Sequence, residues 1–303
     1  MEKKLVPTHK YKTSVVFLDD DVEFLAELQE TVKSFAHDIK FVNNLNEFTS
    51  LVAESKQIKE CLPCIVESMD NEVSDLMDGE ALRVDLSIFN DIRQITNKAK
   101  EVTVVVVDHN LGGQNGIDIC ATLNDSCIER ILLTGDCDYS EALNAMNEKK
   151  INFFIDKLPL SDRFSDFGDD DLEKNLLQKI DIAVDRYFIS KDSYKNKLLC
   201  NRAFKKLYTT IAKSHDIIEH YLIEKDTMLL TSQLGQEFIL KCWMDEDFDN
   251  YCKLYYDELD TLTSQRLEII KNEKKLPIEG KLIDAIKFDE LYYCLIDGEN
   301  DAH

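Results

Sequence analysis

The segment VTVVVVDHNLGGQNGID, residues 102–118, limits the possible folds of this chain more than any other stretch. It begins with a run of β-branched residues, which is typical of a strand buried on both faces of a parallel sheet. The run ends at Asp108, and turn-forming Asn and Gly residues follow. In open α/β sheets, binding sites lie just beyond the carboxyl ends of the strands. Asp108 therefore stands where such a site forms, although Asp is equally common as a cap of the loop or helix that follows a strand.

Other short apolar runs in the first half of the chain alternate with segments of helical spacing. This alternation predicts βαβ units and an α/β fold, with a doubly wound parallel sheet of five strands and helices on both of its faces. The predicted strands are 14–18, 39–42, 102–107, 130–133 and 152–155. The predicted helices are 22–32, 45–52, 117–123, 139–146 and 169–188.

Polar residues stand at the carboxyl ends of four predicted strands, namely Asp19 with Asp20, Asp108, Thr134 and Lys157. In a doubly wound sheet these ends lie side by side, so residues far apart in the sequence converge. Clustered carboxylates repel one another unless a cation lies between them, and carboxylates with a carbonyl and water suit octahedral Mg²⁺. A hydroxyl and an ammonium beside them would neutralise a transferring phosphoryl group, and one carboxylate could be its nucleophile.

This constellation, carried by VVFLDDDVEFLAEL and VVVVDHNLGGQNG, resembles the receiver domain of bacterial two-component response regulators over residues 13–190. The resemblance implies a flavodoxin-like receiver in which Asp108 accepts a phosphoryl group. It also implies a Mg²⁺ site formed by Asp20, Asp108 and the backbone carbonyl of Asn110, with Asp19 acting through water. Three further residues match family positions that respond to phosphorylation, namely the hydroxyl residue Thr134, the lysine Lys157 and the aromatic switch residue Phe154.

The chain departs from the family pattern at two places near this site. Gly112 stands where the family usually has proline, and we expect it to loosen the loop after Asp108. The Lys-Pro pair of the family reads Lys157-Leu158-Pro159 here, so the proline is displaced by one residue. Because a cis peptide bond is costly without proline, the sequence predicts the identity of Lys157 but not its orientation.

The chain between Asp20 and Asp108 is longer than two strand–helix units of roughly 30 residues each require. We assign the excess, about 57–100, to an insertion between the second and third strands, with an acidic stretch at 67–80 and a helix over 82–99. Cys61 and Cys64 form a CxxC pair within it. No second pair and no nearby His completes a zinc set, so we interpret this segment as an ordinary insertion.

Residues 1–190 are predicted to form the receiver domain, and residues 191–303 a second, mainly α-helical output domain of uncharacterised type. Apolar residues recur there at three- and four-residue spacing, which predicts helices over 198–211, 217–230, 237–243, 248–262, 265–271 and 282–295. The sequence contains no P-loop, zinc spacing or helix-turn-helix pattern. A large receiver insertion followed by such an output half resembles quorum-sensing response regulators.

The formal net charge of −23 argues against non-specific nucleic-acid binding by the whole surface. Residues 186–213 run against this trend, because they carry eight Lys and Arg residues and a single acid, Asp192. A solvated helix face is the simplest interpretation of this basic segment. The alternative is a contact surface for DNA, RNA or a nucleotide, formed by Lys195, Arg202, Lys205, Lys206 and Lys213.

The sequence has no apolar core of signal-peptide type and no apolar run of membrane-spanning length. Its nine cysteines are scattered, which is typical of free thiols rather than of a disulfide framework. We therefore expect a cytoplasmic protein without a membrane partner.

These features favour a response regulator that is not an enzyme. A sensor histidine kinase or phosphotransfer protein would phosphorylate Asp108, and the phosphorylated chain would form a homodimer whose output domain controls gene expression. A receiver-bearing adaptor whose second domain binds only protein is one alternative. A Mg²⁺-dependent phosphatase with an aspartate nucleophile is another. Such enzymes usually place a second acid two residues after the nucleophile, and Asn110 at that position is a poor proton shuttle.

Overall fold

A computed structural model of the chain describes residues 5–32, 37–61, 88–123, 127–135, 139–157, 170–191, 196–245, 247–248, 275–278 and 281–297. The chain divides into two compact units. The parallel-sheet unit comprises residues 11–79 and 90–193, and the antiparallel-sheet unit comprises residues 1–10, 80–89 and 194–303. Within the described ranges, no helix is long and apolar enough to cross a membrane.

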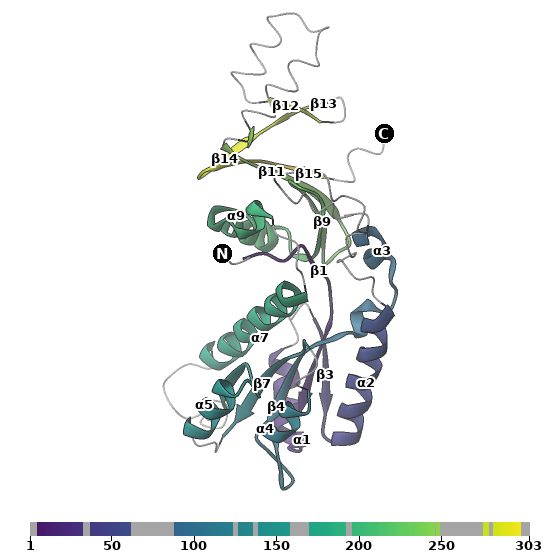
Figure 1. The fold of residues 1–303 in the computed structure, drawn as a ribbon, viewed down its shortest axis with the longest axis vertical. Helices are drawn as coiled ribbons and strands as arrows, with labels where there is room; N and C mark the ends of the chain where they lie inside the picture. Colours follow the sequence, from purple (N-terminus) through teal and green to yellow (C-terminus); the bar gives the residue numbers. More distant parts are fainter. Residues whose placement is uncertain are drawn as a thin grey trace, which may run out of the picture. The chain divides into compact units, whose positions relative to one another are not determined.

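The parallel-sheet unit is built on five parallel strands in the order β3-β2-β4-β7-β8 (Figure 1). In chain order these strands are β2 (Ser14–Leu18), β3 (Asp38–Val42), β4 (Val102–Asp108), β7 (Glu129–Thr134) and β8 (Phe153–Asp156). Every residue of the central strand β4 is buried, as its β-branched sequence predicts. The predicted doubly wound sheet of five strands is confirmed, with the strand order of a flavodoxin-like fold.

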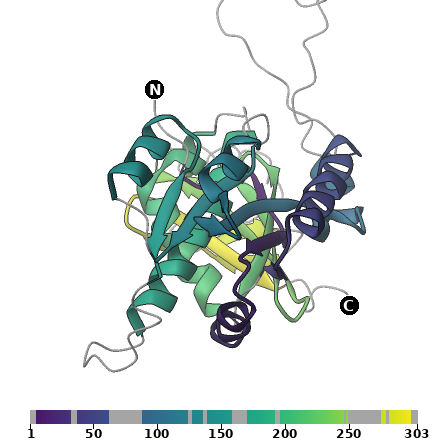
Figure 2. The same ribbon diagram turned by 90° about the horizontal axis from the view of Figure 1, so that it is seen from below.

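Helices pack on both sides of this sheet, as Figure 2 shows from below. They are α1 (Val22–Thr31), α2 (Leu45–Cys61), α4 (Gly116–Ala121), α5 (Tyr139–Asn147) and α7 (Asp170–Lys191). Helix α3 (Ile88–Gln94), which spans the boundary between the two units, and a 3₁₀ helix, η1 (Lys98–Lys100), precede β4 in the chain. One core cluster joins β2 and β4 to α2, α4 and α5 through side chains such as Val16, Val105, Phe48, Ile117 and Ala145. The long helix α7 packs across β4 and β7.

The predicted insertion at 57–100 lies partly within the described residues. Helix α2 continues to Cys61, and α3 and η1 occupy the last part of the insertion, before β4. The helix predicted over 82–99 corresponds to α3, which ends at Gln94. Residues 62–87, with Cys64 and the acidic stretch, lie outside the described residues.

The antiparallel-sheet unit contains a six-stranded sheet in the order β1-β9-β10-β11-β15-β14. Its strands are β1 (His9–Lys10), β9 (Ile217–Glu224), β10 (Thr227–Ser232), β11 (Glu237–Met244), β14 (Ile286–Phe288) and β15 (Leu291–Asp297). A separate hairpin joins β12 (Lys275–Ile278) to β13 (Lys281–Asp284). Two helices, α8 (Lys197–Cys200) and α9 (Arg202–Ser214), precede β9, and α9 buries Phe204, Leu207 and Ile211.

The second half is at least partly helical, as predicted, but three of its predicted helices are wrong. Residues 217–230, 237–243 and 282–295 form strands instead. Buried and half-buried residues alternate along most of β11, which is the period of a strand. The same apolar residues also satisfy three- and four-residue spacing, so periodicity alone did not separate the two structures. The helices predicted over 248–262 and 265–271 lie outside the described residues, apart from Phe248.

The N-terminal segment joins the antiparallel sheet, although the sequence assigned it to a receiver domain of residues 1–190. Strand β1 pairs with β9, and the amide of Leu222 donates to the carbonyl of Thr8 at 2.7 Å. The amide of Val6 donates to the carbonyl of Leu199 at 3.1 Å, and the Val6 and Thr8 side chains are buried. The first residues of the chain are therefore part of the same unit as residues 194–303, which follow α7.

Deleting residues 1–10 should destabilise the antiparallel-sheet unit and leave the parallel-sheet unit unchanged, because β9 would lose its edge partner and Val6 would leave the core. Hydrogen exchange of the full chain measures this directly: amides of β9 and β10 should lose protection, while those of β2 and β4 keep it. A chain that lacks only residues 1–4 is the matched control. Equal protection of β9 in the two deletion variants would contradict this assignment.

Candidate functional site

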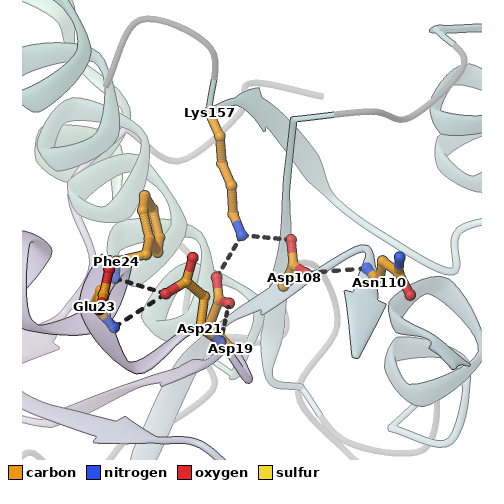
Figure 3. Close-up of polar contacts among 7 residues, drawn as sticks. All are labelled: Asp19, Asp21, Glu23, Phe24, Asp108, Asn110 and Lys157. Carbon is orange, nitrogen blue, oxygen red and sulfur yellow. Dashed lines mark hydrogen bonds and ion pairs between the residues drawn. The ribbon is translucent and has the colours of Figure 1, made fainter. Parts of the chain in front are cut away.

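The carboxyl ends of β2, β4 and β8 bring three predicted residues into direct contact (Figure 3). The ammonium of Lys157, just after β8, lies 2.5 Å from Oδ2 of Asp19 and 2.7 Å from Oδ1 of Asp108. Asp19 follows β2 directly, and Asp108 is the last residue of β4. Residues that are widely separated in the sequence therefore form one charged pocket, as the parallel sheet predicts.

The backbone around Lys157 directs its side chain into the pocket. Its amide donates to the carbonyl of Thr134 at 2.8 Å, which fixes it against the end of β7. The ammonium also lies 4.5 Å from the ring centroid of Phe24 in α1, a cation–π contact. Asp21 caps α1 by accepting hydrogen bonds from the backbone amides of Glu23 and Phe24, which fixes the first turn of the helix that carries this ring. Leu158 and Pro159 lie outside the described residues, yet Lys157 reaches both carboxylates.

Burial sets the electrostatics of this pocket. Asp19 is 2% exposed and Asp108 is 7% exposed. Burial raises the pKa of Asp19, although the Lys157 ammonium opposes the shift and the Asp108 charge adds to it. Burial by itself would lower the pKa of Lys157, but the hydrogen bonds to Asp108 and Asp19 outweigh it, so this pKa is raised. Lys157 therefore stays protonated and compensates the acids around it.

The acids of the pocket have the composition of a magnesium site. One carboxylate oxygen each from Asp19, Asp20 and Asp108 lies within 4.8 Å of the others, and Asp20 is exposed. A cavity of about 220 Å³ adjoins Asp20 and Gly112. Magnesium prefers oxygen ligands and keeps several waters, which fits two carboxylates plus a carbonyl. The chemistry of these residues therefore fits Mg²⁺ at the predicted position.

A two-stranded hairpin follows Asp108 and holds Asn110. It pairs β5 (Asn110–Leu111) with β6 (Gln114–Asn115). The amide of Gly116 donates to the carbonyl of His109 at 2.8 Å, so by alternation Asn110 and Asn115 form a pair that exchanges no ladder hydrogen bonds. The amide of Asn110 instead donates to Oδ2 of Asp108 at 3.1 Å. The carbonyl of Asn110 is likewise not used in the hydrogen bonds between the two strands of the hairpin. Its predicted role as a metal ligand requires this carbonyl to be available.

The turn of this hairpin explains why glycine replaces the proline of the family. Gly112 and Gly113 have φ values of +56° and +95°, as a two-residue type I′ turn requires, and proline cannot adopt them. The Gly-Gly pair between alternating residues was a readable hairpin signal that the sequence interpretation missed. The loop after Asp108 is therefore a defined hairpin, not the loosened segment that we expected from Gly112.

Thr134 and Phe154 lie on the strands that flank the pocket. Thr134 is buried at the end of β7, where it pairs with Asp156 of β8. Phe154 is half-buried and packs edge-on against Tyr139 of α5, with ring centroids 5.2 Å apart. Its carbonyl accepts a hydrogen bond from Lys179 of α7 at 3.1 Å. Phe154 thus connects its strand to helices α5 and α7, and the roles of Thr134 and Phe154 as switch residues stay predictions.

Comparisons with known proteins address the fold. No protein-family model and no curated protein matches the chain. Among solved structures, the Legionella pneumophila response regulator LqsR is similar over 98% of this chain and 91% of its own, with a TM-score of 0.69 and 21% sequence identity. The chain has the fold of a response regulator. The resemblance to a response regulator with a receiver insertion and an unusual second half is thereby confirmed at the level of the fold.

Isolated receiver domains also match part of the chain. One is from an HD domain-containing protein of Pseudomonas fluorescens (16% identity, 58% of this chain and 97% of that one, TM-score 0.33). Another is from a putative Luxo repressor of Vibrio parahaemolyticus (13% identity, 59% and 95%, TM-score 0.34). The assignment of a response-regulator fold therefore rests on the similarity to LqsR, whose TM-score is the higher.

The predicted nucleic-acid contacts lie far from this pocket in the sequence, in the second half of the response-regulator fold. Arg202, Lys205, Lys206 and Lys213 are all exposed along α9, opposite its buried residues. Lys195 lies outside the described residues. The four described cations thus form one basic face of a helix, and what it contacts stays a prediction.

Gly116 is the residue of the pocket that should tolerate substitution least. An alanine Cβ there would lie 1.9 Å from the carbonyl oxygen of Asp108, so Gly116→Ala must displace the end of β4. We expect a loss of about 3 kcal/mol in the free energy of unfolding, measured by urea denaturation.

Gly113→Ala is the matched control, because its Cβ would meet nothing within 4 Å and only the positive φ is unfavourable. That variant should lose about 1 kcal/mol. Equal losses for the two variants would contradict the close approach of Gly116 to the Asp108 backbone.

Proposed function

We propose that this chain is a response regulator that accepts a phosphoryl group on Asp108 from a sensor histidine kinase or phosphotransfer protein. One observation carries the proposal: Lys157 bridges Asp19 and Asp108 beside a third acid, Asp20, at adjoining strand ends. We further propose that the protein acts in the cytoplasm without a membrane partner and has no enzymatic turnover beyond slow gain and loss of its own phosphoryl group.

The proposed transfer is a displacement at phosphorus. A carboxylate oxygen of Asp108 forms the new bond to phosphorus while the bond to the donor histidine nitrogen breaks, and the electron pair stays on that nitrogen. The Lys157 ammonium already touches Asp108 and would neutralise an oxygen of the incoming group. A Mg²⁺ ion held by Asp20, Asp108 and the carbonyl of Asn110, with Asp19 acting through water, would offset the remaining negative charge.

Phosphorylation would then act on the flanking elements. The aspartyl phosphate carries roughly −1.5 to −2 charge in place of the single negative charge of the carboxylate, and Thr134 and Lys157 can approach it from β7 and β8. Phe154 turns inward in this proposal, and its contacts with Tyr139 and Lys179 pass the change to α5 and α7. The result is a homodimer whose output alters gene expression, in a process such as quorum sensing.

The decisive variant is Asp108→Asn, which should abolish labelling of the full chain by acetyl phosphate in the presence of Mg²⁺, because an amide cannot form an acyl phosphate. Intact mass measures the label, and wild type should gain one phosphoryl group. Asp118→Asn, at an exposed acid on the nearby helix α4, is the matched control and should be labelled like wild type. Stoichiometric labelling of Asp108→Asn would overturn the proposal.

A Mg²⁺-dependent phosphatase with Asp108 as nucleophile remains the competing enzyme hypothesis. The side chain two residues on is the amide of Asn110, which cannot shuttle a proton at neutral pH. The hairpin fixes the backbone of Asn110, and the backbone N–H of Asn110 donates a hydrogen bond to Oδ2 of Asp108. Sustained turnover of a small phosphate ester by the purified chain would favour the phosphatase over the regulator.

Exposed apolar residues on α5 and α7 support the proposed homodimer. Tyr139 is 65% exposed and Leu143 is 40% exposed on α5, and Ile182 is 43% exposed on α7. Both helices connect to Phe154 through the contacts described above. Exposed apolar side chains on two helices that both contact the switch residue are suited to association on phosphorylation.

Leu143→Glu with Ile182→Glu should prevent association, because two charges would enter an apolar interface. Light scattering with beryllofluoride and Mg²⁺ should give a doubled mass for wild type and a single-chain mass for the variant. Leu234→Glu, at a residue 96% exposed in the antiparallel-sheet unit, is the control and should still associate. Association of the double variant as strong as that of wild type would place the interface elsewhere.

The basic face of α9 favours a phosphate-bearing ligand of the second domain, which would be DNA, RNA or a nucleotide. Its cations Arg202, Lys205, Lys206 and Lys213 stand on a chain whose net charge is −23, and α9 keeps them all on the exposed side. The alternative output is an adaptor whose second half binds only protein.

Lys205→Gln with Lys206→Gln should weaken binding of a fluorescent oligonucleotide to the full chain and reduce the slope of log K against log salt by about 2, because each phosphate contact contributes about 0.9. Fluorescence anisotropy over a salt series measures both. Lys40→Gln, at an exposed lysine of β3, is the control. Absence of binding by wild type at low salt would favour the adaptor.

A further inference from the structure

A second charged cluster lies at the other end of β4, and phosphoryl transfer does not use it. Glu101 stands directly before β4 and is fully buried. Its carboxylate accepts hydrogen bonds from the hydroxyls of Tyr11 and Tyr187 and from the ammonium of Lys191. We name these four residues the Glu101 cluster. Six buried residues of β4, Val102–Val107, separate Glu101 from Asp108, so the two charged groups do not touch.

The surroundings of the Glu101 cluster leave it little freedom. The ring of Phe188 packs edge-on against Tyr11 and Tyr187, at centroid distances of 4.9 and 5.5 Å. Burial, reinforced by the Glu101 charge, raises the pKa of Tyr187 far above its usual value, so this hydroxyl remains a donor. The amide of Ser14 donates to the carbonyl of Glu101 at 2.8 Å, which ties the cluster to β2 as well.

The partners of Glu101 stand where the chain passes between its two units. Tyr11 is the first residue of the parallel-sheet unit, directly after β1. Lys191 is the last residue of α7, shortly before the antiparallel-sheet unit begins again. One buried carboxylate therefore holds the parallel-sheet end of these two connections to the same strand, β4.

Stability alone gives little reason for a charged cluster here. A buried ion pair can usually be replaced by apolar residues of similar volume without loss, whereas removal of a single partner is costly. What such a pair provides is a single arrangement, because the carboxylate is satisfied only when all of its donors are in place. The Glu101 cluster therefore permits one position of the end of α7 relative to β4.

Helix α7 also contacts the switch residue Phe154, through a residue in its middle. Lys179 donates to the carbonyl of Phe154 in β8. Arg186 lies 3.4 Å from Glu129, at the start of β7. Three cations along α7, with Lys191 as the last, thus contact β8, β7 and Glu101 beside β4 in turn. Because Lys179 contacts the backbone carbonyl of Phe154, a displacement of that backbone reaches α7. The resulting shift of α7 must be accommodated at the Glu101 cluster, where the helix ends.

We propose that the Glu101 cluster is a relay that passes the state of the Asp108 pocket to two of the chain connections with the antiparallel-sheet unit, those after residue 10 and after residue 193. It does so by holding Tyr11 and the end of α7 against β4. A shift of α7 then displaces the chain segments on either side of the unit boundary, because the end of the helix is not free to move by itself. The relay rests on the proposed function of Asp108 as phosphoacceptor.

Hydrogen exchange of the full chain, with and without beryllofluoride and Mg²⁺, tests the relay. In wild type, the phosphoryl mimic should change exchange both near the pocket, at residues 103–117, and beyond the relay, at residues 5–10 and 196–200. Glu101→Gln and Tyr187→Phe should keep the change near the pocket. Beyond the relay, each should reduce the change by about threefold or more, the scale on which a single residue alters coupling between sites.

Two further variants complete the design. Lys100→Met breaks an exposed ion pair with Glu54, 3.0 Å long and adjacent to Glu101 in the sequence, and should transmit the change like wild type. A triple variant, Glu101→Leu with Tyr187→Phe and Lys191→Met, replaces the buried charges by apolar groups and should fold while losing transmission. If Glu101→Gln does not fold, Tyr187→Phe and the triple variant decide.

The outcomes separate the two proposals. No change at residues 103–117 of wild type would overturn the phosphoacceptor function, and the relay with it. A change there without a change at residues 5–10 and 196–200 would overturn the relay alone. Transmission in Tyr187→Phe and the triple variant equal to that of wild type would also overturn the relay, while loss in these variants and not in Lys100→Met supports it.

Discussion

Three carboxylates gathered at one edge of a sheet need a positive charge among them, and the structure of the first unit follows from how that charge is supplied. Asp19 and Asp108 come from neighbouring strands, and the lysine that touches both, Lys157, comes from the far edge strand β8. The pocket therefore exists only when β2, β4, β7 and β8 are assembled in order. A fold that places strand ends side by side and a site that needs opposite charges side by side impose the same arrangement.

The central strand β4 connects two polar sites through an apolar core. Asp108 ends it in the pocket, and Glu101 precedes it at the opposite end. Each acid is held by a lysine from a different element, Lys157 after β8 and Lys191 at the end of α7. In the proposed relay, a change at one acid reaches the other through helix α7, which contacts Phe154 through Lys179 and Glu101 through Lys191.

Much of the parallel-sheet unit was predictable, because an apolar run that stops at a polar residue indicates both a buried strand and its end. The second half was not, since the turn between β9 and β10 at Lys225 and Asp226 has neither Gly nor Pro, and strand residues there also fit helical spacing. The hairpin at Gly112 carried a signal that we interpreted as looseness. The importance of Glu101 had no local signal, because its partners are Tyr11 and Lys191, which only the fold brings near.

The most direct test of the account is to locate the phosphoryl group by chemistry. The full chain, labelled with acetyl phosphate and Mg²⁺, is reduced with borohydride, which converts an aspartyl phosphate to homoserine, and the peptides are sequenced by mass spectrometry. The account predicts a single homoserine, at position 108. A reduced residue at Asp19, at Asp20 or elsewhere, or no reduced residue in protein that carries the label, would contradict it.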